Sequence, residues 1–467
     1  MTVGPASRRA GEAPRRWRLV LQEQVRRRRA AVGSLAALSL KVAGTGLMMA
    51  IFALAARSMT PMAFGNLAVS FNALSFVAVA AVLGQDLLMV RCWGEYATTG
   101  AHGLALGAYR FTWTVVLCSA VAVAALTFVA GVANPLHRLS PGEAAAAAAF
   151  LGMQVLLLFT AQTTRVILNF LVSEPNRELT WRLVILPVVL AGLWFGTGLA
   201  SFYASAAVGL ALAVGLQVVV LLRRFPAAVR DARPVLLRRE WAGRAAGMWV
   251  SAILEAAQQY AEVLMLGVLV SPDVAGLYFL AARIAGIFGM VGAGLHGYTS
   301  SHAANMFFTG QMTGLQNLFR SVMAVAALIT VPILAVVLLG APHILAIFGP
   351  HYADGAWVLA ALALGSFTAA MAGPANSILL VTGHERLYSR VLFVALLVRV
   401  GVILWAAPRF GALGVAAAWA GVNGPVAIGL AVATRRLTGI DPSVLCTVLN
   451  RAPRGPARDA GPRLAAR

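Results

Sequence analysis

Long apolar runs alternate with short polar segments along most of the chain. Runs of about 20 apolar residues match a bilayer core about 30 Å thick. Hydrophobic residues make up 60% of the 467 positions and charged residues only 11%, which is far from the usage of an ordinary soluble domain. The pattern predicts an all-α polytopic membrane protein with about twelve transmembrane helices, centred near Met48, Ser75, Val123, Leu151, Leu190, Gly209, Gln259, Phe288, Thr330, Thr368, Leu396 and Ala420.

Two turns between apolar segments have nearly the same sequence. The first covers residues 60–65 (TPMAFG) and the second covers residues 271–276 (SPDVAG). Other look-alike pairs, such as Arg182 with Arg390, recur at nearly the same offset of about 210 residues, which indicates a duplicated bundle. Such repeats are typical of transporters. We therefore expect two six-helix lobes related as a parallel repeat, with both turns on the external side.

Arginines gather in three segments: before the first predicted span, between the sixth and seventh, and after the last. With twelve spans these segments lie on one side, so the positive-inside rule predicts that both termini and the central loop are cytoplasmic. The net charge of +21 is then a topology signal, and nucleic acid is not an expected partner. The predicted organisation is a basic N-terminal segment (1–34), an N-lobe (35–222), a linker (223–245), a C-lobe (246–437) and a basic tail (438–467).

Polar residues recur at three- and four-residue spacing in the seventh predicted span. Glu255, Gln258, Gln259 and Glu262 share one helix face. A charge at mid-membrane costs about 2.5 to 3.5 kcal/mol, so an ionisable residue there is a functional candidate. The stripe lines a cavity or forms a buried hydrogen-bond network between helices. Because burial raises a carboxyl pKa, Glu255 and Glu262 are candidates for H⁺ or Na⁺ coupling; no cofactor and no metal site is predicted.

Cationic side chains also occur within or beside the predicted spans. Arg283 and Glu262 lie at similar depth from the outside, so they are expected to pair across the hairpin, as a permanent or a switchable contact. Arg399 has no carboxylate in its own or the following span; this favours a site for an anionic ligand, or a partner on the first lobe. With Arg91 and Lys41, these side chains would suit a diphosphate, because guanidinium binds phosphate oxygens bidentately. The alternative for Lys41 is snorkelling to the lipid headgroups.

Several motifs in order resemble a known family. They are residues 54–65, 84–86 (GQD), 91–96 (RCWGEY), 272–278 (PDVAGLY), 347–352 (IFGPHY), 379–386 (LLVTGHER) and 411–418 (GALGVAAA). Over residues 35 to 441 the chain resembles the polysaccharide transporters, or O-antigen and exopolysaccharide flippases, of the multidrug/oligosaccharidyl-lipid/polysaccharide (MOP) superfamily. Relatives often have aspartate where this chain has Glu262, and commonly a proline within residues 301–304, which this chain lacks.

The resemblance implies two six-helix lobes around a cationic cavity that opens alternately to each side. The implied substrate is an undecaprenyl-diphosphate-linked glycan, moved across a bacterial inner membrane for surface polysaccharide synthesis. Membrane lipids, a polysaccharide polymerase and a chain-length regulator are the expected partners.

Other functions remain open on the sequence alone. A multidrug-type cation antiporter shares the architecture, although it would favour a carboxylate in an apolar pocket, and here arginines share the spans. A lipid II flippase would have two extra helices. A polysaccharide polymerase would show a large external loop, and a membrane glycosyltransferase an acidic sugar-nucleotide motif, so an enzyme is not expected.

Overall fold

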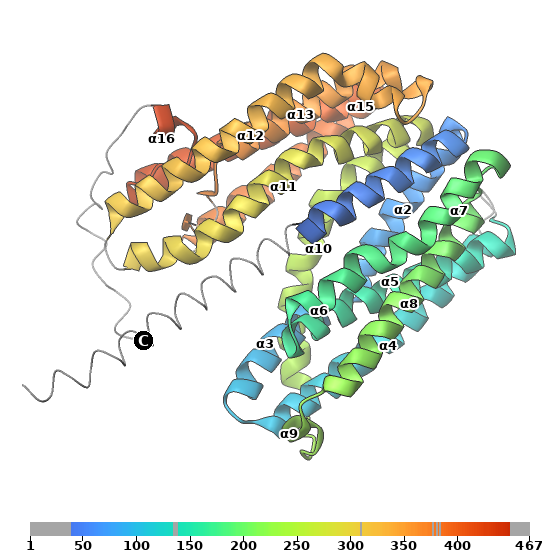
Figure 1. Ribbon diagram of the computed structural model, residues 1–467, viewed down its shortest axis with the longest axis vertical. Helices are drawn as coiled ribbons and strands as arrows, with labels where there is room; N and C mark the ends of the chain where they lie inside the picture. Colours follow the sequence, from blue (N-terminus) through green and yellow to red (C-terminus); the bar gives the residue numbers. More distant parts are fainter. Residues whose placement is uncertain are drawn as a thin grey trace, which may run out of the picture. The chain divides into compact units, whose positions relative to one another are not determined.

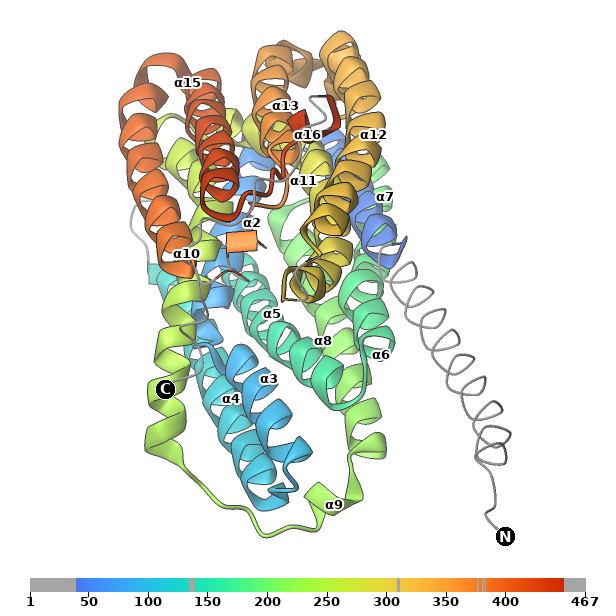
Figure 2. The same cartoon turned by 90° about the vertical axis from the view of Figure 1, so that its left-hand side faces the viewer.

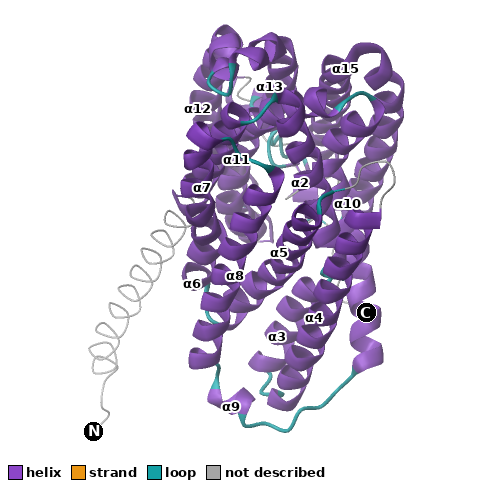
Figure 3. Ribbon diagram, turned by 90° about the vertical axis from the view of Figure 1, so that its right-hand side faces the viewer, coloured by secondary structure: helices purple, strands orange, loops and turns teal. Residues whose placement is uncertain are grey.

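The fold is built from helices joined by short loops. The computed structural model describes residues 39–133, 139–308, 311–375, 378–379, 382 and 384–448, and the described residues form helices and loops without strands (Figures 1 and 3). After a first helix, Ser39–Ser58, come α2 (Pro61–Ala81), α3 (Gln85–Thr98), α4 (His102–Ala133), α5 (Pro141–Ile167), α6 (Phe170–Pro175), the π-helix η1 (Asn176–Thr180), α7 (Trp181–Phe195), α8 (Leu199–Arg224), α9 (Ala227–Arg230), α10 (Arg238–Leu269), α11 (Pro272–Phe308), α12 (Met312–Ala346), the 3₁₀-helix η2 (Pro350–Gly355), α13 (Ala356–Met371), α15 (Glu385–Thr438) and α16 (Leu445–Val448).

All twelve predicted span centres fall within helices of the structure. Ten of the described helices are long and apolar enough to cross a membrane. Two features explain the difference from twelve. The last two predicted spans both belong to α15, which departs from helical geometry at Gly411 (φ 55°) between them; positive φ favours glycine there. The seventh predicted span lies in α10, whose polar stripe and charged first turn make it less apolar than most of the long helices. The chain is a multi-pass membrane protein.

The chain divides into two compact units that interleave along the sequence. The first comprises Met1–Met48, Ala81–Pro187 and Tyr203–Val250, and the second comprises Met49–Ala80, Val188–Phe202 and Ser251–Arg467. The predicted lobe boundaries, with lobes at 35–222 and 246–437, stay a prediction. The predicted N-terminal segment (1–34) and the end of the predicted tail (449–467) lie outside the described residues.

Local sequence signals position the helices within each unit. In the first unit, Ser140 and Glu143 form a capping box at the start of α5, which satisfies free N–H groups of the first turn, and α5 packs on α3 and α4. In the second unit, α13 packs on α11, α12 and α15, and Figures 1 and 2 show these helices side by side. The second unit holds the site described below.

The two copies of the repeated turn meet in the second unit. Each begins a helix, α2 or α11, with proline at the first helical position, where its missing N–H costs nothing. At Gly276 an added Cβ would lie 3.0 Å from the Cα of Gly65. The backbones of α2 and α11 are therefore in close contact where Gly65 meets Gly276. Buried aromatic rings surround the crossing: Phe52, Phe64, Phe71, Phe279 and Tyr352.

Replacing Gly65 with alanine is expected to lower the free energy of unfolding by about 1 to 3 kcal/mol, the usual cost of overpacking. A Cβ at Gly65 would lie 2.0 Å from the carbonyl oxygen of Pro272, so backbone must move. The measurement is unfolding of the purified protein in detergent. Gly94→Ala in α3 is the matched control, because its Cβ would have no atom within 4 Å, and equal stability of the two variants would contradict the packing argument.

Candidate functional site

The polar stripe of α10 faces a cavity in the second unit. Gln258, Gln259 and Glu262 line it together with Val263, as the spacing of the first three along one helix face requires. The cavity measures about 560 Å³, within the range of ligand pockets. The sequence left open whether the stripe lines a cavity or forms an interhelical network, and the structure shows that these three side chains line a cavity.

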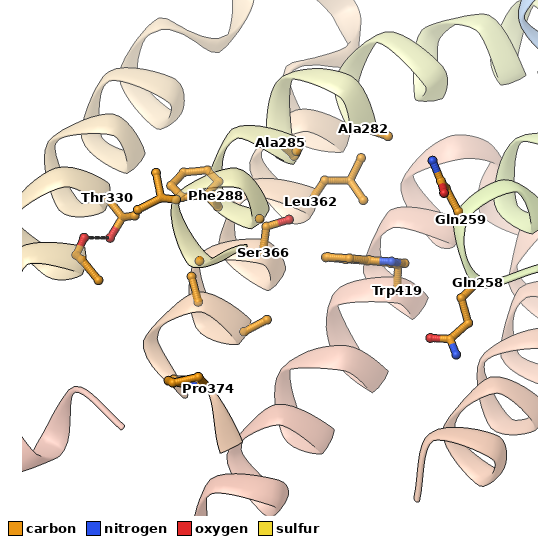
Figure 4. Close-up of a pocket in the computed structure, with 18 of the residues that line it drawn as sticks. Gln258, Gln259, Ala282, Ala285, Phe288, Thr330, Leu362, Ser366, Pro374 and Trp419 are labelled. Carbon is orange, nitrogen blue, oxygen red and sulfur yellow. Dashed lines mark hydrogen bonds between the residues drawn. The ribbon is translucent and has the colours of Figure 1, made fainter. Parts of the chain in front are cut away.

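Five elements build the cavity wall, because small side chains leave room between them. From α11 come Tyr278, Phe288 and a run of Ala and Gly residues, and from α12 come Met323 and Thr330. Ser366 of α13 and Trp419 of α15 complete it. In the view of Figure 4, Gln258 and Gln259 lie on one side and Phe288 and Thr330 on the other, with Trp419 and Ser366 between them.

Glu262, which lines the cavity, forms a buried ion pair with Arg399 of α15. Nε of Arg399 lies 3.3 Å from Oε1 of Glu262, and the two residues are only 4% and 5% exposed. Nη2 of Arg399 also lies 3.4 Å from the carbonyl oxygen of Gln258, to which it donates. The pair therefore joins α15 to α10. Because the pair is buried, removing either residue would leave the other as an uncompensated buried charge and would destabilise the fold.

The ion pair corrects one expectation drawn from the sequence. For Arg399 the sequence predicted an anionic ligand or a partner on the first lobe, whereas its partner is Glu262, in the predicted C-lobe. Helix packing brings α15 against α10, and the spacing along the chain does not reveal it. Arg283, for which equal depth predicted the pairing with Glu262, has its guanidinium carbon 5.0 Å from the centroid of the Phe279 ring, a cation–π geometry.

The remaining predicted site residues occupy different surroundings. Glu255 is exposed on α10, one turn before Gln258 and Gln259. Lys41, in helix Ser39–Ser58, and Arg91, in α3, are exposed residues of the first unit. Their predicted contact with a diphosphate, like the predicted coupling role of Glu255, stays a prediction.

Sequence reasoning missed the polar and aromatic residues that the other helices contribute to the cavity wall: Tyr278, Phe288, Thr330, Ser366 and Trp419. A signal was available for Trp419, since it is a single large ring within the run AAAWAG. A tryptophan surrounded by small residues has space on its faces. Ser366 and Tyr278 follow no spacing rule, and only the packing of α13 and α11 reveals them.

The cavity combines amide, hydroxyl and aromatic groups with a neutralised charge pair. Gln258 and Gln259 offer both donors and acceptors. Because the Glu262 carboxylate already has Arg399 beside it, the pair adds little net charge to the wall. Such a site suits a ligand with hydroxyl or amide groups, and a ligand that carries strong negative charge would compete with Glu262 for the guanidinium.

Comparison with solved structures places this architecture among known membrane transporters. An inward-facing multidrug resistance MATE family transporter of the MOP superfamily matches with a TM-score of 0.71 at 12% identity, covering 86% of this chain and 97% of that chain. An outward-facing form of a MATE family transporter of that superfamily matches with a TM-score of 0.61 at 14% identity, covering 86% and 95%. The lipid II flippase MurJ, in an inward closed conformation, matches with a TM-score of 0.64 at 10% identity, covering 85% and 87%. The chain has the fold of these transporters.

This likeness is one of fold, and it confirms the predicted MATE-like architecture. The matched structures are MATE family transporters of the MOP superfamily and a lipid II flippase. No protein-family model matches the sequence, and no curated protein matches it either. The likeness extends to the fold alone, so a function has to be argued from the residues of the cavity.

Proposed function

We propose that the protein is a flippase that moves polyprenyl-diphosphate-linked oligosaccharides across the bacterial inner membrane by alternating access, for surface polysaccharide synthesis. The observation that supports this most is a cavity lined by Gln258, Gln259, Glu262 and Trp419, in which the Glu262 carboxylate is paired with the buried Arg399. The site offers a cationic group for the diphosphate of such a substrate, and polar and aromatic groups for its sugar. We further propose that both termini are cytoplasmic, that membrane lipids surround the protein, and that a polymerase and a chain-length regulator use its product.

The diphosphate half would be recognised by Arg399. Guanidinium binds phosphate oxygens bidentately and stays charged at all physiological pH values. Glu262 holds Arg399 in place before substrate arrives, which lowers the cost of keeping a charge within the membrane. A diphosphate entering the cavity would displace the carboxylate, and Glu262 would then be free to take a proton or a sodium ion.

The sugar half would be recognised by the neutral groups of the cavity. The amides of Gln258 and Gln259 and the hydroxyl of Ser366 can exchange hydrogen bonds with sugar hydroxyls. The Trp419 ring offers an apolar face for the C–H side of a pyranose. Several lining residues of α11 are Gly or Ala, and their small side chains leave space in the cavity for a bulky headgroup.

A multidrug-type cation antiporter is the second candidate, and one observation favours it. Oε1 of Glu262 is buried and accepts no hydrogen bond from the described residues, so a cationic ligand could approach the carboxylate of this residue, which lines the cavity. Arg399 opposes this function, because its charge repels a cation at the same oxygen.

Reconstitution in liposomes tests the proposal. The purified protein is expected to move a fluorescent polyprenyl-diphosphate-oligosaccharide between leaflets at a rate well above that of empty liposomes. A cationic dye such as ethidium should not be transported, nor should it compete. Ethidium transport with no movement of the lipid-linked glycan would establish the antiporter instead. In cells, deletion of the gene should leave the glycan on the inner leaflet, and normal surface polysaccharide without a redundant copy would defeat the assignment.

A further inference from the structure

Four sequence motifs that lie far apart in the chain meet at a second cavity in the second unit. They are the first repeated turn, the second repeated turn, the segment 347–352 (IFGPHY) and the segment that begins at Gly411. The cavity measures about 410 Å³. It is lined by Pro61 at the start of α2, by Asp273, Val274 and Leu277 of α11, by His351 and Tyr352 of η2, and by Gly411 and Ala412 of α15.

Tyr352 is the most informative residue of this second cavity. The residue is 3% exposed and its ring packs edge-on against Phe64, with centroids 5.9 Å apart. Its hydroxyl is buried, and it has no hydrogen-bond partner among the residues that the structure describes. A buried O–H group without an acceptor costs free energy, so a ligand that supplies an acceptor would bind favourably.

Two further polar groups face the same space. The Asp273 carboxylate lies near enough to act electrostatically on the Tyr352 hydroxyl, and the exposed His351 lines the cavity beside them. Asp273 also stands in the first turn of α11, where a negative charge is favourable for the helix. Because this interaction is electrostatic, the carboxylate oxygens of Asp273 can still accept hydrogen bonds from a ligand.

The combination selects one ligand chemistry. A hydroxyl group accepts a hydrogen bond from Tyr352 and donates one to Asp273 at the same time. A phosphate would be repelled by Asp273, and a cation would find one carboxylate beside a neutral phenol. The remaining wall, from Pro61, Val274, Leu277 and Ala412, is apolar and suits the C–H face of a sugar ring.

We propose that this second cavity binds a neutral sugar residue, through the Tyr352 hydroxyl and the Asp273 carboxylate. The inference rests on the proposed function and extends it, because one oligosaccharide has several sugar residues that different sites can hold. The first cavity serves the diphosphate and one sugar residue, and the junction of the repeated turns serves another sugar residue of the glycan.

Calorimetric titration of the full-length protein in nanodiscs tests this site, with the methyl glycosides of mannose, galactose, glucose and N-acetylglucosamine as probes. At least one glycoside is expected to bind, and Tyr352→Phe should weaken its binding about tenfold, the effect of one hydrogen bond to a charge-supported partner. Asp273→Asn should weaken it similarly. Tyr203→Phe is the matched control, a buried tyrosine of the first unit, and should bind as the unaltered protein does.

Several outcomes would overturn the proposal. The absence of detectable binding by all four glycosides is one, and unchanged affinity in Tyr352→Phe is another. If Tyr352→Phe does not fold, Asp273→Asn decides by the same criterion. Calcium binding that Asp273→Asn abolishes, without glycoside binding, would assign the cavity to a cation. The proposed function fails separately, if glycosides bind as expected but the reconstituted protein moves no lipid-linked glycan.

Discussion

Replacing Arg399 with methionine is expected to abolish transport of the lipid-linked glycan and to lower the free energy of unfolding by about 3 to 5 kcal/mol. Methionine fills a similar volume but leaves Glu262, only 5% exposed, with a buried charge and no cation beside it. Transport should fail because the guanidinium that binds the diphosphate is gone. The measurements are unfolding of the purified protein in detergent and flipping in liposomes.

The double variant Glu262→Gln with Arg399→Met separates the two effects. Removing both charges should restore most of the lost stability, because a buried ion pair can often be replaced by neutral residues at little cost. Transport should not return. Recovery of transport in the double variant would show that Arg399 has only a structural role, and would remove the main support for diphosphate recognition.

Replacing Trp419 with alanine is expected to reduce transport by tenfold or more, the effect of truncating a tryptophan that anchors a ligand, about 2 kcal/mol. The indole lines the cavity between Ser366 and the glutamines of α10, so its loss removes the aromatic face offered to the sugar. Trp419→Phe should retain a large part of the activity. Initial flipping rates at matched protein density provide the measurement.

Trp405→Ala provides the matched control for Trp419→Ala. Trp405 belongs to the same helix, α15, but is 55% exposed, and its removal should leave transport nearly unchanged. Equal losses in the two variants would mean that the rate reports a general property of α15 rather than contact with the glycan.

The sequence predicted the helices well because hydropathy is a local property. Each predicted span centre lies in a helix, and the spacing of Gln258, Gln259 and Glu262 placed these residues on one face, which lines the cavity. The partner of Arg399 could not be predicted in the same way. Which carboxylate meets a given arginine depends on how α10 and α15 pack, and no local spacing records that packing.

The second cavity, likewise, could not be predicted from the motifs that form it. In the sequence, two of its segments stood out as the repeated turn, and the other two, 347–352 and 411–418, as motifs of the family resemblance; nothing indicated that all four meet. Their meeting around Tyr352 follows from the tertiary arrangement of α2, α11, η2 and α15. From the sequence alone, Asp273 is only a carboxylate in the first turn of a helix. The structure shows that it lines the same cavity as Tyr352.

The contact between Gly65 and Gly276 makes the two copies of the repeat each other's neighbour. In a duplicated chain the copies usually become free to diverge, because each meets different surroundings. Here the backbone of one copy limits the side chain that the other can carry, since a Cβ on either would meet main-chain atoms of its counterpart. Substitution at these two positions is therefore coupled: a side chain larger than hydrogen in either copy requires the backbone of the other copy to move.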